Sequence, residues 1–254
     1  MADLAKLAQI VDTAAREATA IPQLSEKHDF TLEDAYAIQQ ISLSRRYGRG
    51  ERQSGIKMGF TSRAKMVQMG LDEMIWGRLT DRMLVEDGGR ISLSDYVHPR
   101  VEPEVAFLLK RPLRGKVSPM AAMAAVEAVA PALEIIDSRY KNFKFSLPDV
   151  VADNSSSSGY VIGGWRRPDS DIGNLGIVLE FNGRAVQVGS SASILGHPAR
   201  SLAAASRLAG HNDFELKAGW VVMAGGATAA EALRPGVSVR CCIENLGAAG
   251  FTVD

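Results

Sequence analysis

The sequence predicts an α+β protein, in which an N-terminal helical segment precedes a mixed β-sheet core. Residues 4–19 and the segment that begins at Thr31, TLEDAYAIQQISLSRRYGRG, carry apolar residues at helical spacing. Beyond residue 52, short apolar runs such as GIKMGF, VEPEVAFLL and GWVVMAGG alternate with Gly, Pro and Asn, as strands joined by turns do. We therefore expect a helical segment over residues 1–52 and a mixed-sheet domain over residues 53–254.

Local signals mark the ends of several elements. Thr31 is a suitable N-cap, and Asp34 stands three residues later, where a capping box has Glu or Gln. Asn182 and Gly183, within LEFNGRAVQ, predict a hairpin with a type I′ turn, because both residues tolerate positive φ angles. Helical patterns interrupt the strands at residues 62–70, 118–129 and 197–210.

Composition and charge exclude several classes of protein. The chain has 254 residues, with 29 basic and 29 acidic side chains and a formal net charge of 0. This balance gives no electrostatic reason to bind nucleic acid or an anionic membrane. No stretch approaches 18 uninterrupted apolar residues, and the N-terminus lacks the apolar region of a signal peptide. The adjacent Cys241 and Cys242 fit neither a long-range disulfide nor a zinc site, so we expect a cytoplasmic protein.

Three acidic residues stand inside apolar strands. Glu102 and Glu104 are one residue apart in VEPEVAFLL, so both side chains leave one face of the strand, roughly 6–7 Å apart. Glu134 lies in the equally apolar PALEIID. The first two could face solvent and the third could be a salt-bridged core residue. If all three instead face one cavity, their oxygens suit Mg²⁺ or Mn²⁺, whereas the scattered histidines do not suit zinc.

Basic residues in apolar or loop segments are the next candidates. Lys57 lies mid-strand between Ile56 and Met58, where it either pairs with an anion at a reacting centre or reaches the surface from an edge strand. Arg139 and Lys144 follow Glu134 closely and could receive a carboxylate of a substrate, although each by itself could be a solvated loop cation.

Two further segments carry polar or small residues. The stretch VADNSSSSGY places four serines in a turn, where they either cap a helix or line a polar pocket. Gly225 and Gly226 follow the strand GWVVMA and can expose backbone amides to an anion.

These motifs, in this order, resemble the 2-keto-4-pentenoate hydratase and 4-oxalocrotonate decarboxylase family, within the fumarylacetoacetate hydrolase superfamily. The resemblance rests on GIKMGFTSRAKMVQMG, VEPEVAF, LEIIDSRYKNFKF, VADNSSS and LGHP, and it covers nearly the whole chain from about residue 30. It implies a β-roll core of the fumarylacetoacetate hydrolase type. The site residues that it implies are a metal site of Glu102, Glu104 and Glu134, and catalytic Lys57, Asp81 and Ser157. From the sequence context described above we add Arg139, Lys144 and Gly226 as expected substrate contacts.

The sequences of the motifs KMGFTSRAKMVQMG and IDSRYKNFKF are more similar to the decarboxylase branch of that family than to the hydratase branch. The implied reaction is the Mg²⁺- or Mn²⁺-dependent conversion of 4-oxalocrotonate (2-oxo-3-hexenedioate) to 2-hydroxypenta-2,4-dienoate and CO₂, in the meta-cleavage degradation of aromatic compounds. The resemblance also implies a homo-oligomer and an association with the pathway hydratase.

Three other interpretations remain open at this point. A 2-keto-4-pentenoate hydratase would use the same metal site but would need a base to activate water. An isomerase or tautomerase of oxo-diacids would release no CO₂. A non-catalytic partner subunit would hold a metal and position another enzyme.

Overall fold

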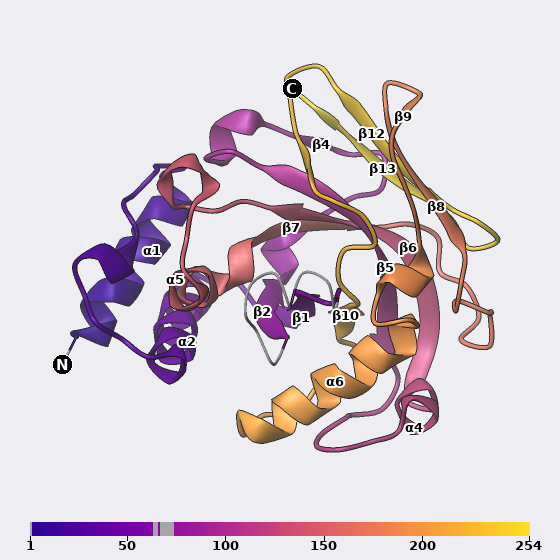
Figure 1. The fold of residues 1–254 in the computed structure, drawn as a ribbon, viewed down its shortest axis with the longest axis horizontal. Helices are drawn as coiled ribbons and strands as arrows, with labels where there is room; N and C mark the ends of the chain where they lie inside the picture. Colours follow the sequence, from indigo (N-terminus) through magenta and orange to yellow (C-terminus); the bar gives the residue numbers. More distant parts are fainter. Residues whose placement is uncertain (1, 63–65, 67–73) are drawn as a thin grey trace.

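Two N-terminal helices pack side by side at one edge of the molecule (Figure 1). The structure is a computed structural model that describes residues 2–62, 66 and 74–254. Helices α1 (Leu4–Arg16) and α2 (Leu32–Gly48) contact each other, and α5 (Leu147–Ala152) contacts α2. The predicted capping box is confirmed, since the Thr31 hydroxyl accepts from the Asp34 amide and the Asp34 carboxylate accepts from the Thr31 amide.

The remaining chain forms two sheets. The eight-stranded sheet has the order β2-β1-β10-β5-β6-β7-β3, with β11 paired to β5, and the five-stranded sheet has the order β4-β13-β12-β8-β9. The strands of the first are β1 (Gln53–Gly59), β2 (Ile75–Thr80), β3 (Leu84–Val85), β5 (Arg100–Leu109), β6 (Val126–Ile136), β7 (Ser157–Ile162), β10 (Val221–Met223) and β11 (Glu231–Ala232). The strands of the second are β4 (Arg90–Ile91), β8 (Gly176–Phe181), β9 (Arg184–Ser190), β12 (Ser238–Ile243) and β13 (Gly247–Val253). Parallel and antiparallel pairs occur in both sheets, so the predicted mixed-sheet α+β class is confirmed.

The larger sheet curves strongly around its own inner face. The hydroxyls of Ser54 on β1 and Tyr160 on β7 are 2.9 Å apart, although three strands separate β1 from β7 in the sheet order. Buried side chains such as Met223, Ala106 and Ala132 pack in one apolar cluster with Tyr160. Helix α6 (Pro198–His211) buries its apolar face in the main core on the other side. The curved sheet agrees with the β-roll core that the resemblance implied.

The local expectations have mixed outcomes. Asn182 and Gly183 have φ angles of 52° and 74° and join β8 to β9, which confirms the hairpin. The helix expected at 197–210 is α6, but the one at 118–129 is wrong in its second half. There α4 (Pro119–Met123) is followed by β6, because valines favour the central strand that pairs with β5. The helix expected at 62–70 lies almost entirely outside the described residues.

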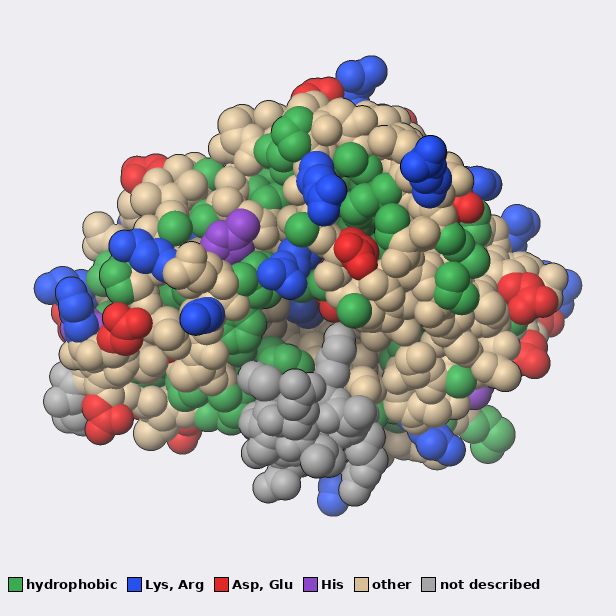
Figure 2. Space-filling model, turned by 45° about the horizontal axis from the view of Figure 1, so that its top comes forward, with side chains coloured by type: hydrophobic (Ala, Val, Ile, Leu, Met, Phe, Trp, Pro, Cys, Tyr) green, Lys and Arg blue, Asp and Glu red, His purple; other side chains and the backbone are tan. Residues whose placement is uncertain are grey.

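The junction between the helical and sheet parts lies where the sequence suggests, since α2 ends at Gly48 and β1 begins at Gln53. The two parts nevertheless share a core, in which Leu7 of α1 and Ile75 of β2 belong to one apolar cluster. Separate domains over 1–52 and 53–254 therefore stay a prediction. No helix in the described part of the chain is long and apolar enough to cross a membrane. Acidic and basic side chains are interspersed on the face that Figure 2 shows.

Candidate active site and metal centre

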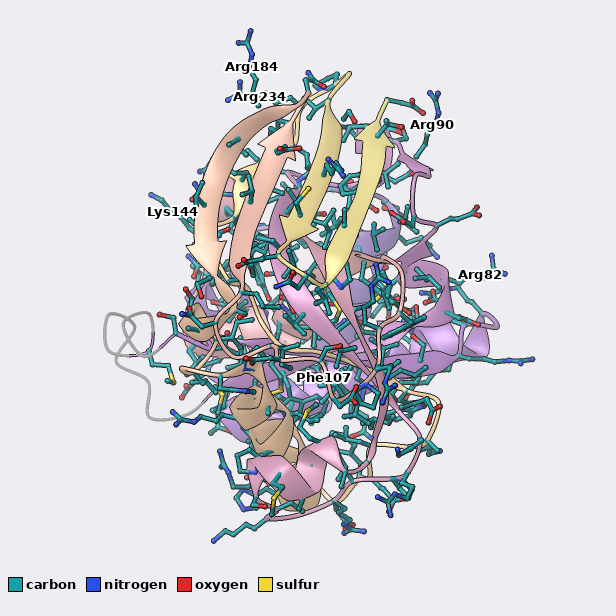
Figure 3. All side chains as sticks on the ribbon, turned by 90° about the vertical axis from the view of Figure 1, so that its right-hand side faces the viewer. Arg82, Arg90, Phe107, Lys144, Arg184 and Arg234 are labelled. Carbon is teal, nitrogen blue, oxygen red and sulfur yellow. The ribbon has the colours of Figure 1, made fainter. Side chains whose placement is uncertain are left out.

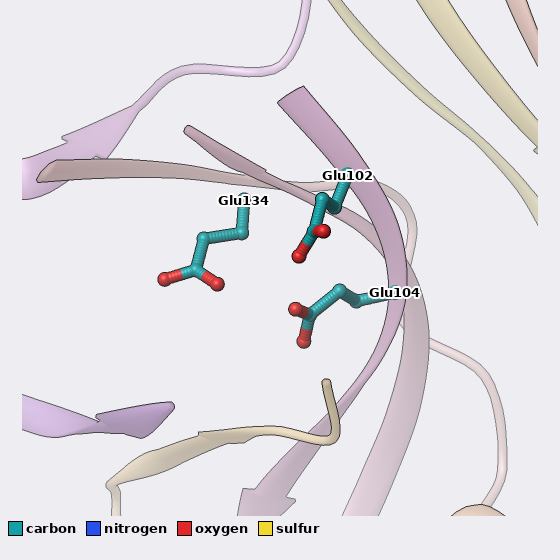
Figure 4. A group of neighbouring side chains, drawn as sticks. All are labelled: Glu102, Glu104 and Glu134. Carbon is teal, nitrogen blue, oxygen red and sulfur yellow. The ribbon is translucent and has the colours of Figure 1, made fainter. Parts of the chain in front are cut away.

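Strands β5 and β6 bring the three predicted acidic residues together. Their antiparallel register places Glu102 directly opposite Glu134, and Glu104 leaves the same face two residues along β5. Each residue offers one carboxylate oxygen, and these oxygens all lie within 4.8 Å of one another. Figure 4 shows the three carboxylates pointing into a shared space. Glu104 and Glu134 are fully buried. The alternative that Glu104 faces solvent is therefore wrong.

Two neighbouring groups pair with this cluster. Lys57 on β1 is 4% exposed, and its Nζ lies 3.1 Å from Oε2 of Glu134, so the alternative of a surface lysine is wrong. The backbone amide of Gly225, just after β10, donates to Oε2 of Glu104 at 2.7 Å. Strands β1, β5 and β6, together with the segment just after β10, thus position these groups.

The electrostatics of the cluster call for a further cation. Three carboxylates and one ammonium group carry a formal charge of −2. Burial raises the pKa of Glu104 well above its ordinary value, and the charges of Glu134 and Glu102 raise it further. Burial also raises the pKa of Glu134, against the opposing effect of Lys57. The Oε1 atoms of Glu104 and Glu134 are buried, and no described residue hydrogen-bonds to them. A divalent cation would satisfy both oxygens and balance the charge, so the residues present fit Mg²⁺ or Mn²⁺.

A pocket opens onto this centre. Its polar lining includes Lys57, Glu102 and Gly226 beside the cluster. Apolar side chains also line it, namely Phe60, Ile75, Ile136, Phe143, Phe145 and Val150. The pocket therefore combines charged and apolar lining, which suits a small molecule that carries both polar and apolar groups.

A turn of unusual backbone conformation forms another side of the pocket. Its residues Asn154, Ser155 and Ser156, here called the serine turn, have φ angles of 50°, 52° and 60°. Three successive non-glycine residues in the left-handed region of φ cost conformational free energy, so contacts with other parts of the chain must hold them in place. The support comes from β2, since Asn154 exchanges two hydrogen bonds with the backbone of Arg78 and the Ser155 hydroxyl donates to the carbonyl of Trp76.

The structure places other serines than Ser157 at the pocket. Ser155 and Ser156 line the pocket, whereas Ser157 is buried and does not line it. The hydroxyls of Ser156 and Ser157 are both buried with no hydrogen-bond partner among the described residues, and that of Ser156, at the pocket, can bond to a bound molecule. The run of four serines shows no periodicity, and the sequence therefore could not tell which hydroxyl faces the pocket.

Three other expected site residues lie elsewhere. Asp81 follows the far end of β2, is exposed, and accepts a hydrogen bond from the Arg52 amide at 2.9 Å. Arg139 is buried and pairs with Asp153. Lys144 is exposed and lies at the edge of the molecule in Figure 3. None of the three lines the pocket, so the structure does not support the catalytic role expected of Asp81 or the substrate contacts expected of Arg139 and Lys144.

Gly226 lines the pocket as expected, and its lack of a side chain has a clear physical reason. A Cβ at this position would lie 2.6 Å from Oε2 of Glu102 and 2.8 Å from its Cδ. We expect Gly226→Ala to displace this carboxylate and to weaken Mg²⁺ binding by roughly 10–100-fold, as changes beside metal ligands commonly do. Calorimetric titration with Mg²⁺ measures the effect.

Gly164→Ala is the matched control for this substitution, because a Cβ at Gly164 meets no atom within 4 Å. This control should bind Mg²⁺ as the unmodified chain does. Equal Mg²⁺ affinity of Gly226→Ala and the unmodified chain would show that Glu102 does not need its present position.

Comparison with known proteins places the chain in a family. The family described as "Fumarylacetoacetate (FAA) hydrolase C-terminal" matches residues 56–254, and the chain belongs to this family. A 4-oxalocrotonate decarboxylase of Pseudomonas sp. is 57% identical over 98% of this chain and 97% of its own. A 2-keto-4-pentenoate hydratase of Paraburkholderia xenovorans is 36% identical over 86% of this chain and 82% of its own.

The chain is also similar to a solved structure of a 4-oxalocrotonate decarboxylase. The 4-oxalocrotonate decarboxylase from Pseudomonas putida G7, complexed with magnesium and adipate, superposes with a TM-score of 0.96 at 36% identity. The superposition covers 99% of this chain and 97% of that one. The similarity therefore extends over the N-terminal helices as well as the sheets.

Proposed function

We propose that this chain is a Mg²⁺-dependent carboxy-lyase that converts 4-oxalocrotonate (2-oxo-3-hexenedioate) to 2-hydroxypenta-2,4-dienoate and CO₂. The main support is the convergence of three carboxylates, two of them fully buried, beside Lys57, with Glu102 and Lys57 lining the adjacent pocket. The 57% identity to a 4-oxalocrotonate decarboxylase supports the same activity, and the magnesium in the similar solved structure supports the choice of metal. Mn²⁺ remains an alternative to Mg²⁺.

The substrate has a carboxylate at C1, a ketone at C2, a double bond between C3 and C4, and a second carboxylate at C6. When the C5–C6 bond breaks, its electron pair moves through the alkene to the ketone oxygen, and protonation gives the dienol. Glu102, Glu104 and Glu134 would hold a Mg²⁺ that, when bound, supplies Lewis-acid stabilisation of the negative charge on that oxygen.

The residues of the pocket have separate tasks in this reaction. The Lys57 ammonium reaches the pocket and can donate to the substrate carboxylate at C1 or to the developing oxyanion. The unpartnered hydroxyl of Ser156 can orient a substrate oxygen. Phe143, Phe145 and Val150 supply apolar surface to the pocket, and next to such surface loss of hydration favours conversion of a carboxylate to neutral CO₂.

The decarboxylase proposal is favoured over the hydratase because a hydratase needs a base to activate water. Among the described residues that line the pocket, the only acid is the cluster residue Glu102, and no histidine is present. The higher identity to the decarboxylase than to the hydratase, 57% against 36%, supports the same choice.

The test supplies each substrate in turn to the purified chain with Mg²⁺. With 4-oxalocrotonate we expect one CO₂ released for each diacid consumed, and chelation of the metal should stop the reaction. With 2-hydroxypenta-2,4-dienoate we expect no 4-hydroxy-2-oxo product. Hydration of the dienol without CO₂ release from the diacid would identify a hydratase, isomerisation of the diacid without CO₂ an isomerase, and turnover of neither would favour a partner subunit.

Three expectations about the surroundings of the enzyme stay proposals. They are a homo-oligomeric assembly, an association with the hydratase of the pathway, and a location in the cytoplasm. Size-exclusion chromatography with light scattering, of the chain alone and mixed with the hydratase, tests the first two.

A further inference from the structure

A second cavity, separate from the active pocket, lies where the N-terminal helices meet the sheet domain. It shares no lining residue with the active pocket and has a volume of about 230 Å³, far more than the ~15 Å³ that one water needs. Its charged lining consists of four arginines and two acids: Arg16, Arg46, Arg49, Arg82, Asp12 and Glu51. We call it the arginine cavity.

Asp12 does not balance the charge of the whole arginine cavity. Its carboxylate is buried and accepts from Arg49 through both oxygens, with Nη2 to Oδ1 at 2.6 Å and Nη1 to Oδ2 at 2.8 Å. Arg45, which does not line the cavity, adds a third contact from Nε at 2.9 Å. Both oxygens of this acid are therefore already hydrogen-bonded to two arginines.

Arg46 is the least exposed of the four arginines that line the cavity. Its side chain is 17% exposed, and its nearest acid is Glu51, with Oε2 at 4.0 Å from Nη1. That same oxygen accepts from the Thr80 hydroxyl at 2.6 Å. Burial lowers the pKa of Arg46 and the positive charge of Arg139 lowers it further, whereas Glu51 and Asp12 oppose this change. No described residue accepts a hydrogen bond from the Arg46 guanidinium.

The N–H donors of the Arg46 guanidinium indicate which class of ligand the arginine cavity can bind. A guanidinium that is largely removed from water is costly unless an anion pairs with it, and its planar fork matches an oxyanion with two oxygens. Arg16 and Arg82, at the margin, are more exposed, and Arg82 projects from the surface in Figure 3. The four arginines exceed the two lining acids by two positive charges.

We propose that the arginine cavity is a binding site for a compact dianion of the phosphate type, with Arg46 as its principal donor. The same chemistry is presented by free phosphate and by the phosphate group of a small metabolite. The site is independent of the metal centre, because neither the glutamate cluster nor Lys57 contributes to it.

Thermal unfolding of the purified, metal-free full chain tests this proposal, with sodium phosphate compared with sodium chloride at equal ionic strength. At a phosphate concentration near ten times Kd, we expect Tm of the unmodified chain to rise by about 2–4 °C. Arg46→Gln should lose this rise. Arg45→Gln should keep it, because Arg45 lies next to Arg46 on α2 and carries the same charge but does not line the cavity.

Two further measurements, calorimetry on Arg46→Lys and a comparison with succinate, test the role of Arg46 and the preference for a compact dianion. If Arg46→Gln fails to fold, titration calorimetry on Arg46→Lys should show phosphate binding at least about tenfold weaker, since lysine lacks the planar fork. Succinate, an extended dianion, should raise Tm less than phosphate does. The proposal is overturned by an unchanged Tm of the unmodified chain in phosphate, by an equal rise in Arg46→Gln, by equal affinity of Arg46→Lys, or by an equal or larger effect of succinate.

Discussion

Glu104→Gln is expected to abolish metal-dependent activity while the protein stays folded. The substitution replaces a carboxylate that shares its space with two other carboxylates, whose oxygens lie within 4.8 Å of its own. An amide oxygen is a much weaker ligand for Mg²⁺ than a carboxylate oxygen, so Mg²⁺ affinity should fall on the order of 100-fold or more, beyond the effect of changes around the ligands. With metal binding lost, kcat should fall below about a tenth of its value in the unmodified chain.

The stability of the metal-free protein distinguishes a ligand from a structural residue. The glutamine oxygen can still accept from the Gly225 amide, which now donates to Glu104 at 2.7 Å. Since the substitution removes one of three like charges that lie close together, two of them fully buried, the Tm of the metal-free variant should equal or exceed that of the unmodified chain. Added Mg²⁺ should raise Tm of the unmodified chain only. A variant that keeps more than a tenth of kcat, or keeps the Mg²⁺-dependent rise in Tm, would show that Glu104 is not a ligand.

Lys57→Met is expected to reduce kcat by on the order of 100-fold, the usual effect of losing one donor to a developing oxyanion, and to raise KM less. Methionine keeps most of the volume of the lysine side chain but removes the ammonium group that lies 3.1 Å from Glu134. The loss of a positive charge beside three carboxylates should leave Mg²⁺ affinity equal or higher. Steady-state kinetics with saturating Mg²⁺, together with calorimetry, measure these quantities.

The combination of lower kcat and retained Mg²⁺ affinity is specific to a group that acts on the substrate. Lys57→Arg is the companion variant, because it keeps the charge and should recover part of kcat. An unchanged kcat in Lys57→Met would make the lysine a structural partner of Glu134. A loss of Mg²⁺ affinity equal to that of Glu104→Gln would mean that Lys57 acts by organising the metal site.

Much of the metal centre could be predicted from the sequence, because a strand has a strict period of 2. The spacing of Glu102 and Glu104 required that both leave one face, and the apolar residues around Glu134 required that its charge be compensated. The capping box at Thr31 and the turn at Asn182 and Gly183 are equally local, since each depends on residues within three positions of one another.

Other site residues could not be placed by such local rules. Ser156 rather than Ser157 lines the pocket because three successive positive φ angles rotate the serine turn, and contacts with β2 hold them. The position of Arg139, shortly after Glu134 in the sequence, suggested a contact with the substrate. In the structure, Arg139 instead pairs with the buried Asp153, fourteen residues further along the chain. Neither the rotation nor the pairing leaves a periodic signal in the chain.

The sequence by itself determined the α+β class and the common face of Glu102 and Glu104, and it indicated the hard divalent cation that three such acids would suit. Only the tertiary structure decided that Glu102 lies opposite Glu134, that Lys57 reaches the same cluster, and that Arg46 faces a cavity of its own. The physical reason is one of range. Periodicity and capping act between neighbours along the chain, whereas strand register and sheet curvature depend on the packing of segments that are distant in sequence.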